Sequence, residues 1–314
     1  MVDMTRDEQG TAWRPMTASE YPWPVPPDHT SPPQWTERGF VLDGMPIPVI
    51  AYTQSESGWS DELTTFHEET AGTDHPIDRA SRSFALSGLD QLKRDDPVIL
   101  EIGCSSGYLL RLIRDRYPRA TVIGADYVLG PLEELAPTLP DVPIIQFDLT
   151  QCPLPSQSVD AVIMLNVLEH IKDDQAALQQ VYRILRPGGL LILEVPAGPR
   201  LYDVYDELLM HFRRYTMRRV KRLFGRVGFE SVSATHLGAI VFPAFALVKL
   251  RNRRFLSREQ AYKQQVVAGN IRSTGSSFLL KAAFGLETWL GRRITWPFGI
   301  RCVLLGWKPD QPNQ

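Results

Sequence analysis

The stretch at residues 98–113, VILEIGCSSGYLLRLI, restricts the fold more than any other part of this 314-residue chain. A short apolar run leads to an acid, Glu101, and then to two glycines, Gly103 and Gly107, that bracket a tight turn. Leucine and isoleucine then recur at three- and four-residue spacing, which predicts a helix. Glycine accepts positive φ and has no Cβ, so such a turn can approach a bound nucleoside closely. Strand, glycine turn and helix in this order predict the first unit of a doubly wound α/β sheet.

A regular alternation of strand and helix patterns follows the glycine turn. We expect further strands at residues 121–126, 142–147, 159–165, 190–195 and 229–234, and helices at 131–139, 173–185 and 216–227. Alternation of this kind indicates parallel strands joined by right-handed crossovers. A helical pattern at 77–94 precedes the first of these strands, and residues 300–307 have the composition of a last strand. The sequence therefore predicts a Rossmann-like, doubly wound, mostly parallel sheet of seven strands.

Four regions follow from this pattern: an N-terminal extension at 1–76, a core at 77–236, a helical insertion or lid at 237–298, and a last strand with a tail at 299–314. The extension is partly irregular. Prolines and three tryptophans alternate in residues 1–35, which favours an extended tail over the surface, although the tryptophans could pack on the body. Short strands are expected at 40–52, around the turn at Asp43 and Gly44, and a helix at 60–70.

Composition excludes several classes of protein. The 34 basic and 36 acidic residues nearly cancel, so the bulk charge gives no sign of a nucleic-acid partner. Three widely spaced cysteines indicate a reducing compartment and have no paired zinc-ligand spacing. The first residues show no signal-peptide pattern, and no run of 18 apolar residues occurs. We therefore expect a cytoplasmic protein, and the oligomeric state stays open.

The spacing of the glycines favours one nucleoside cofactor over another. Three residues separate Gly103 from Gly107, whereas a dinucleotide fingerprint needs Gly-x-Gly-x-x-Gly, so a nicotinamide dehydrogenase is disfavoured. The motif Glu-x-Gly-x-x-x-Gly resembles the first motif of class I S-adenosylmethionine-dependent methyltransferases of type 11 or 12. The resemblance extends over residues 77–234 and implies S-adenosylmethionine as the cofactor.

The candidate cofactor residues follow successive strands. Asp126 ends the second strand, where an acid can accept hydrogen bonds from both ribose hydroxyls; the alternative is an aspartate that caps the next helix. The resemblance implies that Asp148 receives the adenine amino group and that Asn166 and Val167 line the methionine part. The full expected set is Glu101, Gly103, Cys104, Ser105, Gly107, Asp126, Tyr127, Asp148, Leu149, Asn166 and Val167.

Three candidate catalytic residues, His170, His211 and Tyr215, lie on the expected acceptor side. His170 is a general base or, as the favoured alternative, a structural loop histidine. Some relatives carry Glu-x-x-His here for a metal, whereas Glu169 and His170 are adjacent, so no metal is expected. His211 and Tyr215, in the stretch HFRRYT, could meet an acceptor hydroxyl or amine, and the neighbouring Arg213 and Arg214 an anionic group. The alternative for this stretch is a solvated start of a helix.

These residues predict a methyltransferase that acts on an oxygen or nitrogen of a small-molecule or glycan-type acceptor. Two alternatives stay open: an enzyme for a lipid-linked acceptor at a membrane surface, and a non-catalytic accessory protein that binds the cofactor. The insertion at residues 237–298 is relevant to the lipid-linked alternative. Its apolar residues 237–250 would reach about 20 Å as a helix, too short to span a bilayer core of about 30 Å. They form a lid over the acceptor, which we favour, or contact a membrane together with Arg251, Arg253 and Arg254.

Overall fold

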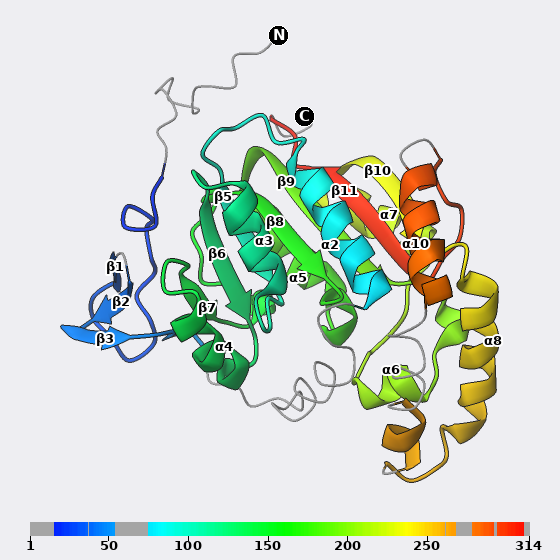
Figure 1. Ribbon diagram of the computed structural model, residues 1–314. Helices are drawn as coiled ribbons and strands as arrows, with labels where there is room; N and C mark the ends of the chain where they lie inside the picture. The colour runs from blue at the N-terminus through cyan, green and yellow to red at the C-terminus, as the bar shows by residue number, and fades with distance from the viewer. Residues whose placement is uncertain are drawn as a thin grey trace.

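A computed structural model describes residues 16–36, 38–53, 75–260, 262–267, 278–291 and 294–310. In this part of the chain an eight-stranded sheet has the order β10-β11-β9-β8-β5-β6-β7-β4 (Figure 1). Its strands are β4 (Ile50–Ala51), β5 (Val98–Ile102), β6 (Thr121–Asp126), β7 (Ile144–Gln146), β8 (Val159–Leu165), β9 (Leu185–Pro196), β10 (Glu230–Leu237) and β11 (Arg301–Trp307). The expected helix at 60–70 lies outside the described residues.

The sheet confirms the predicted α/β class. Strands β4 to β9 pair in parallel, and β11 lies antiparallel between β9 and β10. All five residues of β5 are buried, which explains why this strand reads as a continuous apolar run. Strand β9 begins five residues before the expected position because Leu185 already pairs with Val159.

Helices cover both faces of the sheet. They are α2 (Pro76–Leu89), α3 (Tyr108–Arg116), α4 (Leu129–Leu135), α5 (Asp174–Ile184), α6 (Val204–Leu208), α7 (Met217–Val227), α8 (Phe242–Asn252) and α10 (Phe278–Gly291). One apolar core joins α2, α3 and α4 to the sheet, and a second joins α5 and α7 to its other face (Figure 1). Local signals set the helix starts: Asp173 and Thr216 accept hydrogen bonds from Ala176 N and Arg219 N as the N-caps of α5 and α7.

The pairing of the N-terminal segment with the main sheet was not anticipated, whereas the short strands at residues 40–52 were. Ile50 and Ala51 pair with β7 at the sheet edge, so the extension contributes to the main sheet. Before them, β1 (Gln34–Thr36), β2 (Gly39–Leu42) and β3 (Met45–Ile47) form a small antiparallel sheet. Tyr21 and Trp23 are buried in the main core, and the Tyr21 hydroxyl lies 2.8 Å from Ser158 Oγ. The part of the segment around Tyr21 and Trp23 therefore packs on the body and is not a loose tail.

The described part of the insertion between β10 and β11 holds the helices α8 and α10. Helix α10 packs against α2, whereas α8 packs against two short 3-10 turns, η4 (Pro199–Leu201) and η5 (Arg253–Phe255). The two insertion helices thus have different neighbours in the described part of the chain. Among the described residues, no helix has the length and apolar character needed to cross a membrane.

Candidate active site

A single cavity of about 1140 Å³ opens where the parallel strands end. The loops after β5, β6, β7 and β8 line one part of it, and α6, α8 and α10 line the other. Ligands of open α/β sheets bind at the carboxyl ends of the strands, so the position is the expected one. Pockets for one small molecule usually hold about 300–1000 Å³. This cavity therefore has room for a cofactor and an acceptor together.

The glycine turn forms the cofactor wall. Gly103 has φ +81°, and a Cβ at this position would lie 2.4 Å from Val167 Cγ2. The amides of Gly103 and Cys104 donate to the Ala125 carbonyl, which ties the turn to β6. Gly107 has φ +70° and begins α3, but it does not line the cavity; a Cβ there would meet Leu135. Gly107 therefore shapes the turn between β5 and α3.

Two aspartates stand at the ends of β6 and β7. Asp126 Oδ2 accepts from Ser105 N at 3.0 Å, and Oδ1 accepts from Tyr127 N at 2.7 Å. These bonds hold the carboxylate at the cavity wall; the cap of α4 is Val128, so Asp126 does not cap that helix. Asp148 Oδ1 accepts both hydrogen bonds from Thr150, at 2.8 Å each, and leaves Oδ2 to face other partners.

The surroundings of the Glu101 carboxyl indicate whether the site fits S-adenosylmethionine. It lines the cavity, and burial, followed by the nearby charge of Asp126, raises the pKa of Glu101 well above its usual range. Its Oε2 atom has no hydrogen-bond partner among the described residues. A buried carboxyl oxygen without a partner is unfavourable, and a cationic or hydroxyl-bearing ligand would supply one. S-adenosylmethionine carries a sulfonium, an ammonium and ribose hydroxyls, so the residues present fit this cofactor.

The loop after β8 continues the cofactor wall. Asn166 adopts φ +55°, and its Nδ2 donates to Glu194 Oε1 at 2.7 Å. The same Glu194 oxygen accepts from Arg301 at 2.7 Å, and Arg301 also binds Asp78 and Ser81. Glu194 and Arg301 were missed by sequence reasoning because they lie on strands β9 and β11, without a local motif. Of the predicted cofactor residues, all except Gly107 line the cavity.

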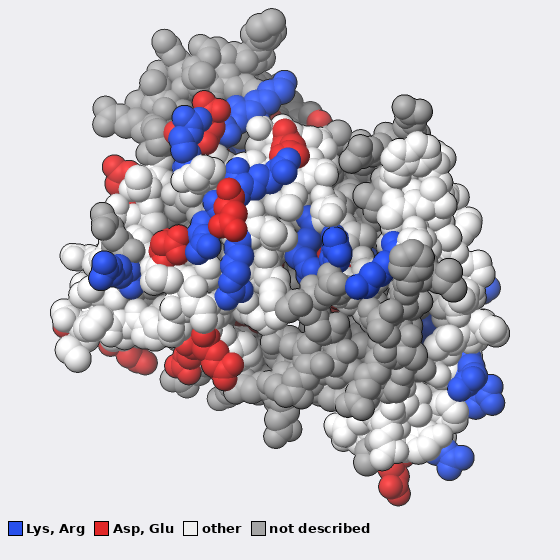
Figure 2. Space-filling view, viewed as in Figure 1, with Lys and Arg blue, Asp and Glu red and all other residues white. Residues whose placement is uncertain are grey.

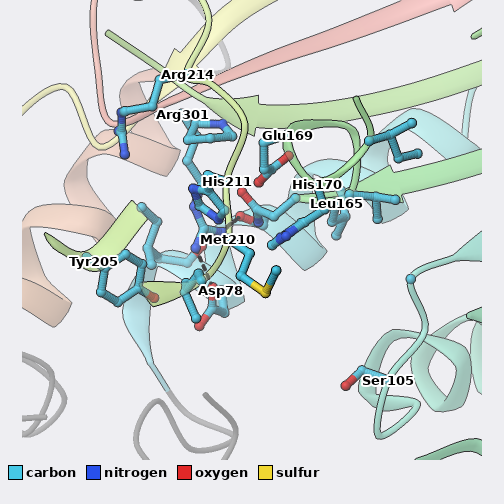
Figure 3. A pocket seen from close by; sticks show the side chains of 18 of the residues that line it. Asp78, Ser105, Leu165, Glu169, His170, Tyr205, Met210, His211, Arg214 and Arg301 are labelled. Atoms are coloured by element: carbon cyan, nitrogen blue, oxygen red, sulfur yellow. Dashed lines mark hydrogen bonds and ion pairs between the residues drawn. The ribbon is translucent and has the colours of Figure 1, made fainter. Parts of the chain in front are cut away.

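Two histidines form the acceptor end. The rings of His170 and His211 lie edge to face, with centroids 4.7 Å apart, and both line the cavity (Figure 3). His211 Nδ1 lies 2.9 Å from Asp206 Oδ1, so its Nε2 is the ring nitrogen left for another partner. Burial lowers the pKa of His211, and the hydrogen bond with Asp206 opposes that shift. His170 therefore lies at the cavity wall, beside His211.

Asp206 is the centre of a buried charge network that sequence reasoning did not find. Its Oδ1 accepts from Arg214 at 2.8 Å, and its Oδ2 accepts from Lys249 at 2.9 Å. Lys249 also binds Asp203 Oδ1 at 2.6 Å. Burial alone would raise the pKa of Asp206, but the His211 bond and the two cations outweigh it and hold the pKa below its ordinary value. The network fixes His211 and fastens α8 to α6.

Tyr215 requires a correction. The expectation that it faces an acceptor is wrong, because its side chain is completely buried and does not line the cavity. Its hydroxyl donates to Asp174 Oδ2 at 3.1 Å, and its backbone amide donates to the Pro196 carbonyl. The strand-like pairing with Ala197 draws the ring into the core. Arg213 is likewise bound to the Ile171 and Lys172 carbonyls and does not line the cavity.

The insertion supplies the apolar part of the wall. Phe245 and Val248 of α8 and Phe284 of α10 line the cavity. The polar and apolar side chains of α8 are placed unusually. Lys249 and Asn252 are buried, whereas Leu247 and Leu250 are 70% and 52% exposed. Its polar side docks through the Asp206 network, which leaves apolar side chains on the outer face.

Comparisons with known proteins identify the central part of the chain. Residues 100–193 match a family described as methyltransferase domain. A probable S-adenosylmethionine-dependent methyltransferase of Mycolicibacterium smegmatis is 34% identical over 172 residues, which cover 54% of this chain and 65% of the relative. The trans-aconitate 2-methyltransferase of Azoarcus sp. is 32% identical over 37% of this chain and 44% of its own length. The chain thus spans less than two thirds of these relatives.

Solved structures share the fold. Phosphoethanolamine N-methyltransferase 2 of Haemonchus contortus matches 81% of this chain and 59% of its own, with a TM-score of 0.52 and 15% identity. The [4+2]-cyclase SpnF matches 79% of this chain and 93% of its own, with a TM-score of 0.53 and 16% identity. With the glycine turn and the ordered acids, the matched domain at residues 100–193 is of the class I S-adenosylmethionine-dependent methyltransferase type.

Proposed function

We propose that this protein transfers the methyl group of S-adenosylmethionine to an oxygen or nitrogen of a small-molecule or glycan-type acceptor. One observation carries the proposal: a single cavity joins the glycine turn to a polar end that holds His170 and His211. The cofactor wall and the acceptor end are therefore continuous, as an in-line transfer between two bound molecules requires. We also propose a cytoplasmic location, which the three free, buried cysteines support.

The cofactor half uses the residues that follow the strands. Asp126 would accept the ribose hydroxyls, Asp148 the adenine amino group, and Glu101 the cationic methionine end. When bound, S-adenosylmethionine supplies an electrophilic methyl carbon. The chain aligns the acceptor with that carbon, and the apolar side chains of α8 and α10 exclude water.

His211 is positioned to handle the acceptor proton. Asp206 is ionised, so His211 Nδ1 must carry the hydrogen that joins them, and Nε2 then has a free lone pair. An acceptor hydroxyl at Nε2 would give up its proton there while its oxygen attacks the methyl carbon. The relatives are named as a trans-aconitate 2-methyltransferase, a ubiquinone/menaquinone biosynthesis C-methyltransferase and a malonyl-[acyl-carrier protein] O-methyltransferase, so their names leave the acceptor of this chain open.

A methyl-labelling assay tests the proposal. The protein is incubated with tritiated S-adenosylmethionine and with separate polar, glycan and lipid fractions, and transfer of label is measured. His211→Gln is expected to reduce turnover at least about 100-fold and to leave cofactor affinity, by calorimetry, within about threefold. His236→Gln is the matched control, because His236 is also buried but does not line the cavity. Cofactor binding without transfer to any fraction would contradict the enzyme and favour an accessory protein.

A second acceptor class is favoured by the outer face of the insertion. Leu247 and Leu250 on α8 and Trp289 on α10 are exposed, the last at 63%. In the view of Figure 2, Lys and Arg side chains lie along the edge formed by α8, and the surface visible above them is largely uncharged. Arg251, Arg253 and Arg254 are exposed at the end of α8. Apolar side chains flanked by arginines suit an anionic bilayer surface, and hence a lipid-linked acceptor.

Liposome flotation separates the two acceptor classes. Binding to anionic vesicles that salt weakens, and that Arg251→Glu with Arg253→Glu removes, would support a lipid-linked acceptor. Equal changes at Arg218 and Arg222, which are exposed on α7, serve as the charge control. Absence of binding at low salt would leave α8 and α10 as a lid over a diffusible acceptor.

A further inference from the structure

Three metal-ligand side chains meet at the acceptor end of the cavity: Glu169, His170 and His211. One ligand atom from each lies within 4.8 Å of the others, and the side chains point toward one another (Figure 3). The first two come from the 3-10 turn η3 (Leu168–His170), and His211 comes from the loop after α6. We propose that these three residues bind a divalent first-row transition-metal ion.

The Glu169 carboxylate is the strongest argument for a cation site. The residue is 0% exposed, and neither carboxylate oxygen has a hydrogen-bond partner in another described residue. The nearby arginines are engaged elsewhere: Arg301 binds Asp78 and Glu194, and Arg214 binds Asp206 and the Ala197 carbonyl. A buried carboxylate without a partner is costly, and a bound metal ion removes that cost.

His211 has the support that a metal-binding histidine requires. Its Nδ1 lies 2.9 Å from Asp206 Oδ1, which fixes the ring and directs the Nε2 lone pair away from Asp206. Histidine ligands of metal ions usually donate their second nitrogen to a carboxylate in this way. Asp206 is itself held by Arg214 and Lys249, so the ring orientation is set by a rigid network.

The donor set selects the kind of ion. Two imidazoles and one carboxylate suit zinc, iron(II), cobalt(II) or manganese(II), whereas magnesium and calcium prefer oxygen ligands alone. Ligand atoms at about 2.0–2.2 Å from a common ion lie about 3–4 Å apart, so small side-chain rotations would close the present arrangement. Three protein ligands leave open positions, and all three residues line the cavity that leads to the glycine turn.

An ion at this place changes the role of His211 in the reaction. Its Nε2 lone pair would bind the metal, and the metal would lower the pKa of an acceptor hydroxyl bound at an open position. This consequence rests on the proposed methyl transfer, whereas the metal site does not. Binding is measured without any acceptor, so failure of one proposal leaves the other intact.

Cobalt absorption provides the test. Tag-free protein is dialysed against a chelator and titrated with Co²⁺, which is expected to give visible d–d bands that saturate at one ion per chain, and with Zn²⁺ in a calorimeter. Glu169→Gln, His170→Gln and His211→Gln should each weaken Zn²⁺ binding at least about 100-fold, and Asp206→Asn about 10- to 100-fold. His236→Gln should bind the ion as the wild type does. Calorimetric titration with S-adenosylmethionine verifies that each variant is folded.

Two outcomes would overturn the proposal. One is wild-type protein that binds neither ion in the micromolar range after chelation. The other is a folded Glu169→Gln or His211→Gln variant with unchanged cobalt bands, which would place the ion elsewhere. Should the variants fail to fold, X-ray absorption of the wild-type zinc complex decides: two imidazoles among nitrogen and oxygen ligands are expected, and a sulfur-containing set would refute the assignment.

Discussion

Replacing Lys249 by methionine tests how the insertion is fastened to the core. Lys249 is buried and lies 2.6 Å from Asp203 Oδ1 and 2.9 Å from Asp206 Oδ2. Asp206 keeps Arg214 and His211 after the change, whereas Asp203 loses its cation and keeps the backbone amides of Tyr205 and Asp206 as donors. Methionine preserves the length and apolar stem of the side chain. The main effect is therefore that the buried Asp203 carboxylate has no cation to balance its charge.

The expected loss is about 3–5 kcal/mol of unfolding free energy, the usual cost of removing one partner of a buried ion pair. Urea denaturation at pH 8, followed by tryptophan fluorescence, measures it. Lys263→Met is the matched control: Lys263 also joins the insertion to α6, through Glu207 at 3.0 Å, but Glu207 is exposed, so the loss should stay below about 1 kcal/mol.

The pH dependence gives a second check on the same substitution. Burial raises the pKa of Asp203 and Lys249 opposes that rise, so loss of Lys249 raises the pKa further. A carboxyl with a raised folded pKa binds more protons when folded, so its destabilising effect falls as the pH falls. The Lys249→Met deficit should shrink from pH 8 to pH 5, and adding Asp203→Asn should reduce it at pH 8. A deficit equal to that of Lys263→Met would refute this reasoning.

Three further changes test other parts of the chain. Asp126→Ala should weaken S-adenosylmethionine binding by about 2–4 kcal/mol, or about 30- to 1000-fold, because two charge-assisted hydrogen bonds are lost; unchanged calorimetric affinity in folded protein would remove Asp126 from the site. Gly103→Val should abolish cofactor binding, because φ is +81° and the new side chain would collide with Val167; a folded variant with normal affinity would contradict this assignment. Tyr21→Phe should cost about 0.5–1.5 kcal/mol in urea denaturation through loss of the bond to Ser158, and no change would show that this bond is not stabilising.

The core of the fold was predictable because its signals are local. Apolar runs, glycine turns and helix caps lie within a few residues of the elements they specify, and β6 and β8 appear with the expected bounds. The two-residue strand β4 has no such signal. It exists because Ile50 and Ala51 meet Ile145 and Gln146, which lie almost a hundred positions away.

The residues at the acceptor end likewise include some with a local sequence signal and some without one. The stretch around His211 was found from its place after β9, but its partners could not be read locally. Lys249 reaches Asp206 across 43 positions. His170 meets His211 across a long connection, so adjacency of Glu169 and His170 said little about metal binding. Tyr215 was misassigned because position beyond a strand does not reveal which side chains turn back into the core.

The packing of the N-terminal segment has a consequence for synthesis on the ribosome. Tyr21 emerges 137 residues before Ser158, its partner at the start of β8. At about 5–20 residues per second, that interval lasts about 7–27 s. Throughout it, Tyr21, Trp23 and Phe40 have no completed sheet to cover them, although all three are buried in the finished core. The part of this core that is translated first thus reaches its place late, and its aromatic side chains are open to chaperones or to other nascent chains until β8 has been made.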